Sequence, residues 1–375
     1  MKICKKTIMD QTDPDIKFDE NGISNHWHDY FKRLKPIHKD TKIRDIALNN
    51  LIDQIIKNGR KKEYDCIVGL SGGVDSTYVC YLSKNLGLRP LVVHFDNGWN
   101  SEAAVQNIES TIETLGLDLY TYVVDWEEFK NLQLSFLKAS TPDSEIPTDH
   151  GMIALLYNLA NKHKIKYILT GVNVTQESIL PLKWGYGYFD LKYIKAVNRL
   201  FSKNKLITFP KLPFLKLLYF SKIKGIRFIS FLDYFPYNKK ETIELLVKQV
   251  NYKPYEGKHH ESVYTRFFQS YILPKKFKID KRKAHLSNLI CSGQITRQEA
   301  LNELKKDISS PDLIIKDKNF LLNKFELSKA EFEAILDLPP KLFSDYPNNY
   351  NFFEFLKKIK KLMSGILGKK LFEIE

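Results

Sequence analysis

The chain has 375 residues, of which 43% are hydrophobic and 27% charged, which is typical of a folded globular protein and excludes fibrous and low-complexity classes. Its formal net charge of +14 raises nucleic acid or an acidic ligand as a partner. The four Cys residues are too dispersed for a disulfide framework. A basic start that runs into acidic residues is not a secretory signal, and no apolar run approaches the roughly 18 residues of a transmembrane helix. We therefore expect a cytoplasmic protein of one large or two modest domains.

The first 40 residues are polar and rich in turn signals, which predicts a small N-terminal appendage over 1–40. From 41 to 180, strand and helix patterns alternate. The expected order is a helix over 43–56, a strand over 65–70, a helix to 86, a strand over 90–95, a helix over 101–115, a strand over 119–124, a helix over 153–162 and a strand over 167–170. This alternation predicts an α/β fold, with a parallel sheet covered by helices on both faces. Ligands bind beyond the carboxyl ends of such strands, where Ser71, Asp96, Asp125 and Gly171 fall.

The pattern changes after residue 180. Between 181 and 240 there are 13 Lys and Arg residues, two acidic residues and 15 aromatic residues. Helical segments are expected over 239–250, 262–271, 283–291 and 296–306, so 181–306 is predicted to be a mainly helical substrate or partner region and 307–375 a helical tail of unknown role. The stretch 183–237 fits a nucleic-acid surface, an interfacial membrane segment, or a substrate or partner face, and we favour the last.

The motif that carries chemistry is Ser71-Gly72-Gly73-Val74-Asp75-Ser76, between an apolar strand and a helix. Adjacent glycines let the backbone close on phosphate oxygens at a helix N-terminus, where an anion is favoured. The hydroxyls of Ser71 and Ser76 add donors, and Asp75 is placed to orient the loop or to hold a divalent cation. The loop lacks the Gly-Lys-Ser/Thr ending of a Walker A motif, so γ-phosphoryl transfer of that type is not indicated.

This loop resembles that of the PP-loop ATP pyrophosphatases, which are adenylating enzymes that cleave ATP between its α- and β-phosphates. The resemblance implies that Ser71, Gly72, Gly73, Asp75 and Ser76 hold pyrophosphate with Mg²⁺ on Asp75. It also implies an adenine seat around His94, Phe95 and Asp96, and further nucleotide contacts from Gly171 and Asn173.

A closer resemblance covers roughly residues 1–306 and is to the N-acetyl sugar amidotransferases. It is carried by Thr12-Asp13-Pro14-Asp15-Ile16, Gly171-Val172-Asn173, Pro254-Tyr255-Glu256-Gly257-Lys258-His259-His260-Glu261-Ser262 and Asp280-Lys281-Arg282-Lys283-Ala284-His285-Leu286-Ser287. Members of this family convert the acetamido group of a nucleotide-linked sugar into an acetamidino group during synthesis of lipopolysaccharide O-antigen or flagellin glycan. The implied reaction uses ATP and Mg²⁺ to adenylate the amide oxygen, and ammonia then displaces AMP.

The resemblance also implies which residues act in the reaction. Ser71, Asp75, His260 and Glu261 are the expected catalytic residues, although a His/Glu turn is also typical of a solvated surface. Arg266, Lys281 and Arg282 fit a grip on the diphosphate of the substrate or, equally, a solvated helix face. Asp149 fits a substrate contact or a helix cap. The other expected substrate-binding residues are His150, Glu177, Lys258 and Gln269.

One departure from the family concerns zinc. The N-terminal segment of the family usually carries two Cys-x-x-Cys pairs, whereas the corresponding positions here are Cys4, Thr7, Ser24 and Trp27. A single thiolate cannot hold a tetrahedral zinc, and although His26 and His28 lie close by in the sequence, we expect no bound zinc.

No cysteine lies in a context typical of a glutaminase nucleophile, and residue 2 is Lys, which excludes an N-terminal Cys nucleophile. We therefore expect imported ammonia. The resemblance implies a separate glutaminase and a barrel protein similar to those of imidazole-glycerol phosphate synthase.

Two alternatives stay open at the level of sequence. A PP-loop tRNA-modifying enzyme would adenylate a base carbonyl, and the net charge supports it, but the charge is concentrated in one stretch and the Cys features of many sulfur-transfer members are missing. A degenerate scaffold protein is the other, and the intact loop from Ser71 to Ser76 argues against it. Nucleic acid is thus not the favoured partner.

Overall fold

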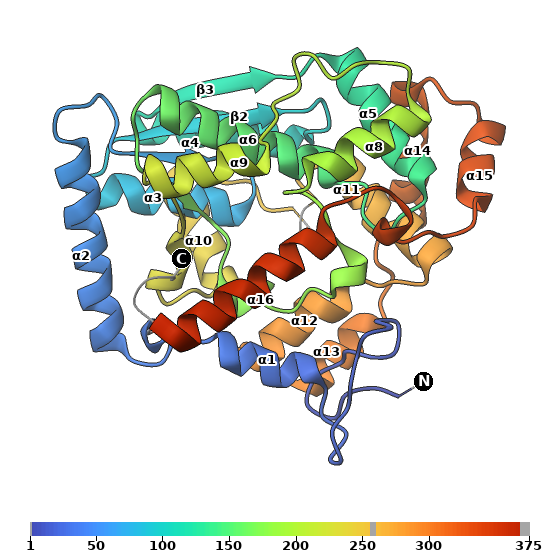
Figure 1. Cartoon of the computed structure of the whole chain (residues 1–375), viewed down its shortest axis with the longest axis horizontal. Helices are drawn as coiled ribbons and strands as arrows, with labels where there is room; N and C mark the ends of the chain where they lie inside the picture. Colours follow the sequence, from blue (N-terminus) through green and yellow to red (C-terminus); the bar gives the residue numbers. More distant parts are fainter. Residues whose placement is uncertain (1, 256–259, 368–375) are drawn as a thin grey trace.

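A computed structural model describes residues 2–255 and 260–367, with side chains as far as residue 359 (Figure 1). Its centre is a five-stranded sheet with the order β3-β2-β1-β4-β5, in which every neighbouring pair is parallel. The strands are β1 (Cys66–Gly69), β2 (Pro90–Asp96), β3 (Asp118–Val123), β4 (Tyr167–Thr170) and β5 (Arg227–Ser230). The predicted α/β fold with a parallel sheet is confirmed.

Alternation along the central strands explains why both faces of the sheet are covered. Val68, Val92 and Leu169 pair in register on one face and pack with α2 (Thr41–Gly59), α3 (Val74–Asn85) and α4 (Glu102–Leu115). Ile67 and Ile168 point to the other face and pack with α5 (Trp126–Ala139) and α6 (Ile146–Lys162). Successive side chains of a strand alternate between faces, so strands that are apolar throughout need helices on both sides.

Two elements of this unit lie outside the predicted pattern. The sequence pattern predicts no element over the residues that form α5. The segment Arg227–Ser230 falls in the region predicted to be mainly helical, whereas it forms β5, paired in parallel with β4 from Tyr167↔Arg227 to Thr170↔Ser230. The sheet therefore continues beyond residue 180. A four-residue strand carries too little alternation to be recognised from its sequence. Its strand conformation depends on pairing with β4, which lies 60 residues earlier in the chain.

The rest of the chain is mainly helical, as predicted. The remaining helices are α1 (Asn25–Arg33), α7 (Val174–Glu177), α8 (Leu191–Phe201), α9 (Phe214–Leu218), α10 (Lys239–Val250), α11 (Val263–Phe267), α12 (Arg282–Cys291), α13 (Arg297–Leu304), α14 (Pro311–Phe325), α15 (Lys329–Asp337) and α16 (Tyr350–Leu367). A wider helical turn over Phe268–Phe277 continues α11. Capping boxes begin α13 and α15. Within the described residues, no helix has the length and apolar character needed to cross a membrane.

The N-terminal segment packs against α12 and α13. Cys4 is buried, and its sulfur accepts the backbone N–H groups of Thr7 at 3.4 Å and Ser24 at 3.2 Å. Burial would raise the pKa of the Cys4 thiol, but hydrogen bonds from Ser24 and Thr7 outweigh it and the pKa is lowered. Arg297 of α13 donates to the carbonyls of Cys4 and Thr7. Among the side chains that the structure describes, no group of three or more His, Cys, Asp or Glu residues is arranged to hold a metal ion.

Candidate functional site

The loop between β1 and α3 can have only glycine at residue 72. Gly72 has a φ of +78°, and a Cβ added there would lie 2.4 Å from the carbonyl oxygen of Ala104 on α4. The loop is also held from within, because the Ser76 hydroxyl donates to the Gly73 carbonyl at 3.0 Å and accepts the Ser71 N–H at 3.2 Å. The loop backbone therefore packs directly against α4, and this contact restricts the loop to one conformation.

The loop ends at the N-terminus of α3. Gly73 is the N-cap residue and has no side chain to bond the first N–H groups of the helix. These groups and the helix dipole favour an anion at this position. The Ser71 hydroxyl oxygen lies in the same turn, 3.2 Å from the Ser76 hydroxyl oxygen. The arrangement fits the phosphate cradle that the motif predicts.

Asp75 connects this loop to two other parts of the chain. The Tyr237 hydroxyl donates to its carboxylate, and burial, together with Asp75, raises the pKa of Tyr237. Gly171, just after β4, lies so close that an added Cβ would be 2.8 Å from the Cβ of Asp75. The carboxyl end of β4 can therefore approach the loop only with glycine at that position. The structure places Asp75, Gly171 and Tyr237 together.

A second part of the chain, consisting of Tyr255 and residues 260–263, lies beside the loop. The backbone N–H of Ser101 donates to the Glu261 carbonyl at 2.8 Å, and that of Val263 donates to Trp99 at 2.8 Å. These bonds hold Glu261 beside the loop, where a Cβ added to Gly73 would lie 3.2 Å from both Glu261 Oε1 and the Tyr255 hydroxyl.

Within this segment, Tyr255 donates to Glu261 Oε2 at 2.9 Å, and burial, followed by the nearby Glu261 carboxylate, raises the pKa of Tyr255. His260 directly precedes Glu261 and is partly buried. The predicted substrate-binding residue Lys258 lies outside the described residues.

The end of β2 contains the predicted adenine seat. His94 is buried, and its ring bonds the Leu70 carbonyl through Nδ1 and the Asn100 amide through Nε2, both at 2.9 Å. An amide NH₂ can only donate, so Nε2 accepts and Nδ1 carries the proton. His94 thus ties β2 to the start of the loop.

The next two residues of β2 differ in exposure. Phe95 is 9% exposed and stacks on Tyr122, with 5.9 Å between ring centroids. Asp96 is partly exposed, and its carboxylate accepts the Gly98 N–H at 2.9 Å. Of the three residues predicted around adenine, Asp96 therefore presents the most accessible side chain.

Asn173 and Glu177 lie at the two ends of the short α7 beyond β4, Asn173 as the N-cap residue and Glu177 as the last helical residue. Asn173 is 2% exposed and caps this helix by accepting the Gln176 N–H at 2.9 Å. Its amide also donates to the Gly171 carbonyl at 3.3 Å, which fixes the turn beside Asp75. Glu177 is the last residue of α7 and lies near enough to Tyr237 to contribute to its raised pKa.

Three predicted substrate-binding side chains have partners within the chain. His150 bonds the Tyr188 carbonyl and accepts the Leu212 N–H at 3.2 Å, and its burial lowers its pKa. Arg266 makes two hydrogen bonds of 2.7 Å to Asp317 on α14. Arg282 pairs with Asp280 and bonds backbone carbonyls at the end of α13.

Two acidic residues that no sequence motif marks, Glu145 and Asp143, lie near the predicted residue Asp149 at the start of α6. Glu145 accepts the Thr265 hydroxyl at 2.6 Å through Oε2, and its Oε1 has no hydrogen-bond partner among the described residues. Burial raises the pKa of Glu145 to about 8. The hydrogen bond from Thr265 opposes this rise, and the nearby carboxylates of Asp149 and Asp143 add to it. Lys281 lies within electrostatic reach of Glu145. The predicted residues Asp149 and Lys281 thus lie close to one carboxyl group, and Gln269 is partly buried on the turn after α11.

Two family models match this chain. The model for the C-terminal domain of WbpG-like LPS biosynthesis proteins matches residues 261–360, and the model for NAD synthase matches residues 46–206. The matches support the resemblance to the N-acetyl sugar amidotransferases and to the PP-loop enzymes. No curated protein sequence gives a significant match.

Three solved structures are similar to the chain at low identity. NH3-dependent NAD synthetase from Campylobacter jejuni is 15% identical over 76% of this chain and 95% of its own, with a TM-score of 0.31. NMN synthetase from Francisella tularensis is 15% identical over 77% and 97%, with a TM-score of 0.30. A predicted subunit of tRNA methyltransferase from Methanocaldococcus jannaschii is 18% identical over 49% and 75%, with a TM-score of 0.29. The fold assignment rests on the strand order above and not on these three.

Proposed function

We propose that this chain is the synthetase half of an ATP-dependent amidotransferase that converts the acetamido group of a nucleotide-linked N-acetyl sugar into an acetamidino group. The product would enter lipopolysaccharide O-antigen or flagellin glycan. One observation carries the proposal: Glu261, the first residue of the WbpG-like match, lies against Gly73, which is inside the NAD synthase match. A single site would thus combine a phosphate-binding loop with a carboxylate from a domain typical of lipopolysaccharide biosynthesis.

The chemistry explains why an ATP-cleaving loop suits this reaction. An amide carbon is a poor electrophile, so the amide oxygen first attacks the α-phosphorus of ATP, and the bond to pyrophosphate breaks. Ammonia then adds to the activated carbon, loses a proton and expels AMP, which leaves a C=NH group where C=O stood. Ser71 and the first N–H groups of α3 would bind the phosphates. Glu261, oriented by Tyr255, would accept the proton from the ammonia nitrogen.

Asp75 is the residue that fits Mg²⁺. This ion is commonly bound by one or two carboxylates together with substrate phosphates, so Asp75 beside the loop suffices without a protein cage. The ion would supply positive charge against the departing pyrophosphate. Tyr237 keeps its proton because its pKa is raised, so it would donate to Asp75 and orient the carboxylate toward the phosphate-binding loop.

Ammonia would come from another protein. Cys66 on β1 and Cys80 on α3 are fully buried, and burial raises the pKa of both thiols, which makes them poor nucleophiles. A separate glutaminase with a barrel-type delivery protein would supply this synthetase in the cytoplasm. Rates with ammonium and with glutamine test this point, because equal use of both by the isolated chain would contradict it.

The deciding experiment measures pyrophosphate release from ATP with Mg²⁺ and ammonium. UDP- and CMP-linked acetamido sugars are compared with bulk tRNA as acceptors. The proposal expects sugar-dependent release and a product about one mass unit lighter, because NH replaces O. Release that depends on tRNA and not on sugar would refute it and identify a base carbonyl as the adenylated group.

Two variants with matched controls link the activity to the site. Asp75→Ala is expected to abolish pyrophosphate release, whereas Asp53→Ala, an exposed carboxylate on α2, is expected to leave it unchanged. Glu261→Gln is expected to lower kcat by about 10²–10⁴-fold, as for loss of a general base, with little change for the exposed Glu244→Gln on α10. An active Asp75→Ala protein would remove the loop from the mechanism.

A further inference from the structure

Exposed cations and exposed apolar side chains are concentrated in the segment that runs from α8 through the α8–α9 connection and α9 to Lys224, just after the helical turn that follows α9. The helices α8, α9 and α16 lie on the same, near side of the molecule (Figure 1). We call this surface the cationic apolar face. Its apolar members are Leu200, Ile207, Leu215, Tyr219 and Ile223, and its exposed cations are Lys192, Lys195, Arg199, Lys203, Lys205, Lys216, Lys222 and Lys224.

The aliphatic side chains on this face are unusually exposed. Leu215 is 77% exposed, Ile207 76% and Ile223 74%, and these are the three highest values for large apolar side chains among the described residues. Each is flanked within two positions by a lysine: Lys205 precedes Ile207, and Lys216 follows Leu215. Leaving such side chains in water forgoes the stabilisation that burial gives, so contact with an apolar phase would be favourable.

The positive charge of the cationic apolar face is not neutralised by acidic residues of the same stretch. The stretch 181–240 has only two acidic residues, and both are turned inward. Asp190 is 1% exposed and caps α8 while accepting from Asn349. The side chain of Asp233 is 9% exposed and accepts the Val174 N–H. Across the part of the chain that the structure describes, no carboxylate forms an ion pair with Lys192, Lys195 or Arg199.

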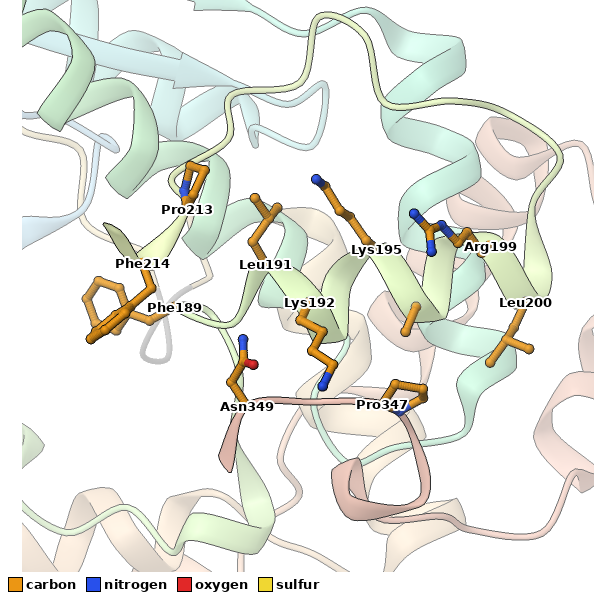
Figure 2. Close-up of a pocket in the computed structure, with 11 residues that line it drawn as sticks. Phe189, Leu191, Lys192, Lys195, Arg199, Leu200, Pro213, Phe214, Pro347 and Asn349 are labelled. Carbon is orange, nitrogen blue, oxygen red and sulfur yellow. The ribbon is translucent and has the colours of Figure 1, made fainter. Parts of the chain in front are cut away.

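These three cations surround an open groove of about 540 Å³ along α8. The groove is also lined by Phe214 at the start of α9 and by Pro347. Lys195 and Arg199 extend from one side of α8, and Lys192 extends from the other, toward the segment with Pro347 and Asn349 (Figure 2). The floor is largely apolar, so the groove offers cations above a surface that hydrocarbon can cover.

We propose that the cationic apolar face docks the protein onto an anionic phospholipid surface. Lysines with exposed aliphatic side chains between them are typical of segments that lie in the headgroup region, where the cations meet lipid phosphates and the apolar tips enter the acyl boundary. The cores of protein–protein interfaces are instead depleted in Lys, which argues against a protein partner for this face. The docking is peripheral and requires no membrane-spanning helix. It is independent of the proposed reaction.

The test is co-sedimentation of the full chain with vesicles. Vesicles of pure phosphatidylcholine are compared with vesicles containing about 30 mol% phosphatidylglycerol at about 0.1 M salt. Each cation near an anionic surface contributes about a fivefold factor in partitioning, so the triple variant Lys192→Gln, Lys195→Gln, Arg199→Gln is expected to bind about a hundredfold more weakly. The matched control, Lys42→Gln, Lys57→Gln, Lys61→Gln, removes three exposed cations around α2 and is expected to change binding only a few-fold.

A second pair of variants tests the apolar contribution. Ile207→Ser, Leu215→Ser, Ile223→Ser is expected to weaken binding at least tenfold at all salt concentrations. Its control, Ile46→Ser, Val123→Ser, Ile315→Ser, removes three exposed apolar side chains elsewhere and is expected to have no effect. All these residues are exposed, so circular dichroism and thermal unfolding are expected to match the parent chain. Lack of binding to anionic vesicles, equal binding to neutral ones, or equal losses in variants and controls would overturn the proposal.

Discussion

The buried ion pair between Arg266 and Asp317 provides a test of whether Arg266 has a structural role or its predicted role in binding the substrate. Asp317 of α14 is replaced by alanine, which leaves the guanidinium of Arg266 without its partner. The two bonds are 2.7 Å long, and the side chains are 15% and 4% exposed. Removing one partner of a buried pair costs about 3–5 kcal/mol, and the partial exposure of Arg266 favours the lower end.

The expected loss for Asp317→Ala is therefore about 3 kcal/mol in the free energy of unfolding. For 375 residues the entropy of unfolding is about 0.8 kcal/mol per kelvin, so Tm should fall by about 4 °C. Arg266→Ala should have a similar effect. The double variant should lose less than the sum of the single losses, with a coupling of about 2 kcal/mol.

The assays are urea and thermal unfolding together with pyrophosphate release as a function of sugar concentration. The control is Glu333→Ala, which breaks the more exposed pairs with Lys318 and Lys275 and should cost about 1 kcal/mol or less. The reasoning is refuted if Arg266→Ala raises KM for the sugar while Asp317→Ala does not and the two stability losses are additive. That outcome would assign Arg266 to the substrate rather than to α14.

Three further expectations concern other parts of the chain. Gly72→Ala should cost at least about 1–2 kcal/mol in stability and lower pyrophosphate release, because the added Cβ at positive φ meets Ala104; unchanged activity would contradict the tight course of the loop. Glu145 has a pKa raised from 4.5 to about 8, so the stability that its protonated form contributes is complete below the lower value and is lost as the pH rises through the higher one. The Tm of Glu145→Gln minus that of the parent chain should therefore increase from about pH 5 to about pH 9. A difference in Tm that stays constant over this range would contradict the reasoning. Thr296→Ala removes the capping box with Glu299 and should cost about 1 kcal/mol by urea unfolding, without altering pyrophosphate release.

The sheet was predictable because its signals are local. The strand of Val68 and the strand of Val92 are apolar runs followed by turns, and the alternation with helices leaves few topologies. The loop from Ser71 to Ser76 follows from the same order of strand, glycine turn and helix. By contrast β5 is four residues long and is specified by its pairing with β4, which no local pattern reveals.

The candidate site was predictable only where a motif marks it. Tyr237 reaches Asp75 across 162 positions of sequence and lies in no pattern that points to the loop. Tyr255 does lie in the family segment that contains Glu261, but that segment alone does not reveal its bond to the Glu261 carboxylate. Glu145 was missed because its raised pKa results from burial and from neighbours brought together by folding. The partner of Arg266 likewise comes from 51 residues further along. A charged side chain in a sequence does not reveal whether a carboxylate or a ligand will face it.

Hydrogen bonds join Ser101 to Glu261 and Trp99 to Val263, so the complete nucleotide site can form only after residues 261–263 have been synthesised. The loop and its strand emerge first from the ribosome, but Tyr237, Tyr255 and Glu261 emerge about 160–190 residues later. A nascent or prematurely terminated chain that stops before Tyr237 would have the phosphate loop without Tyr237, Tyr255 and Glu261. On the proposed mechanism, such a fragment could bind a nucleotide yet lacks the carboxylate that assists amidine formation. The order of the chain thus delays turnover until the later segment is present.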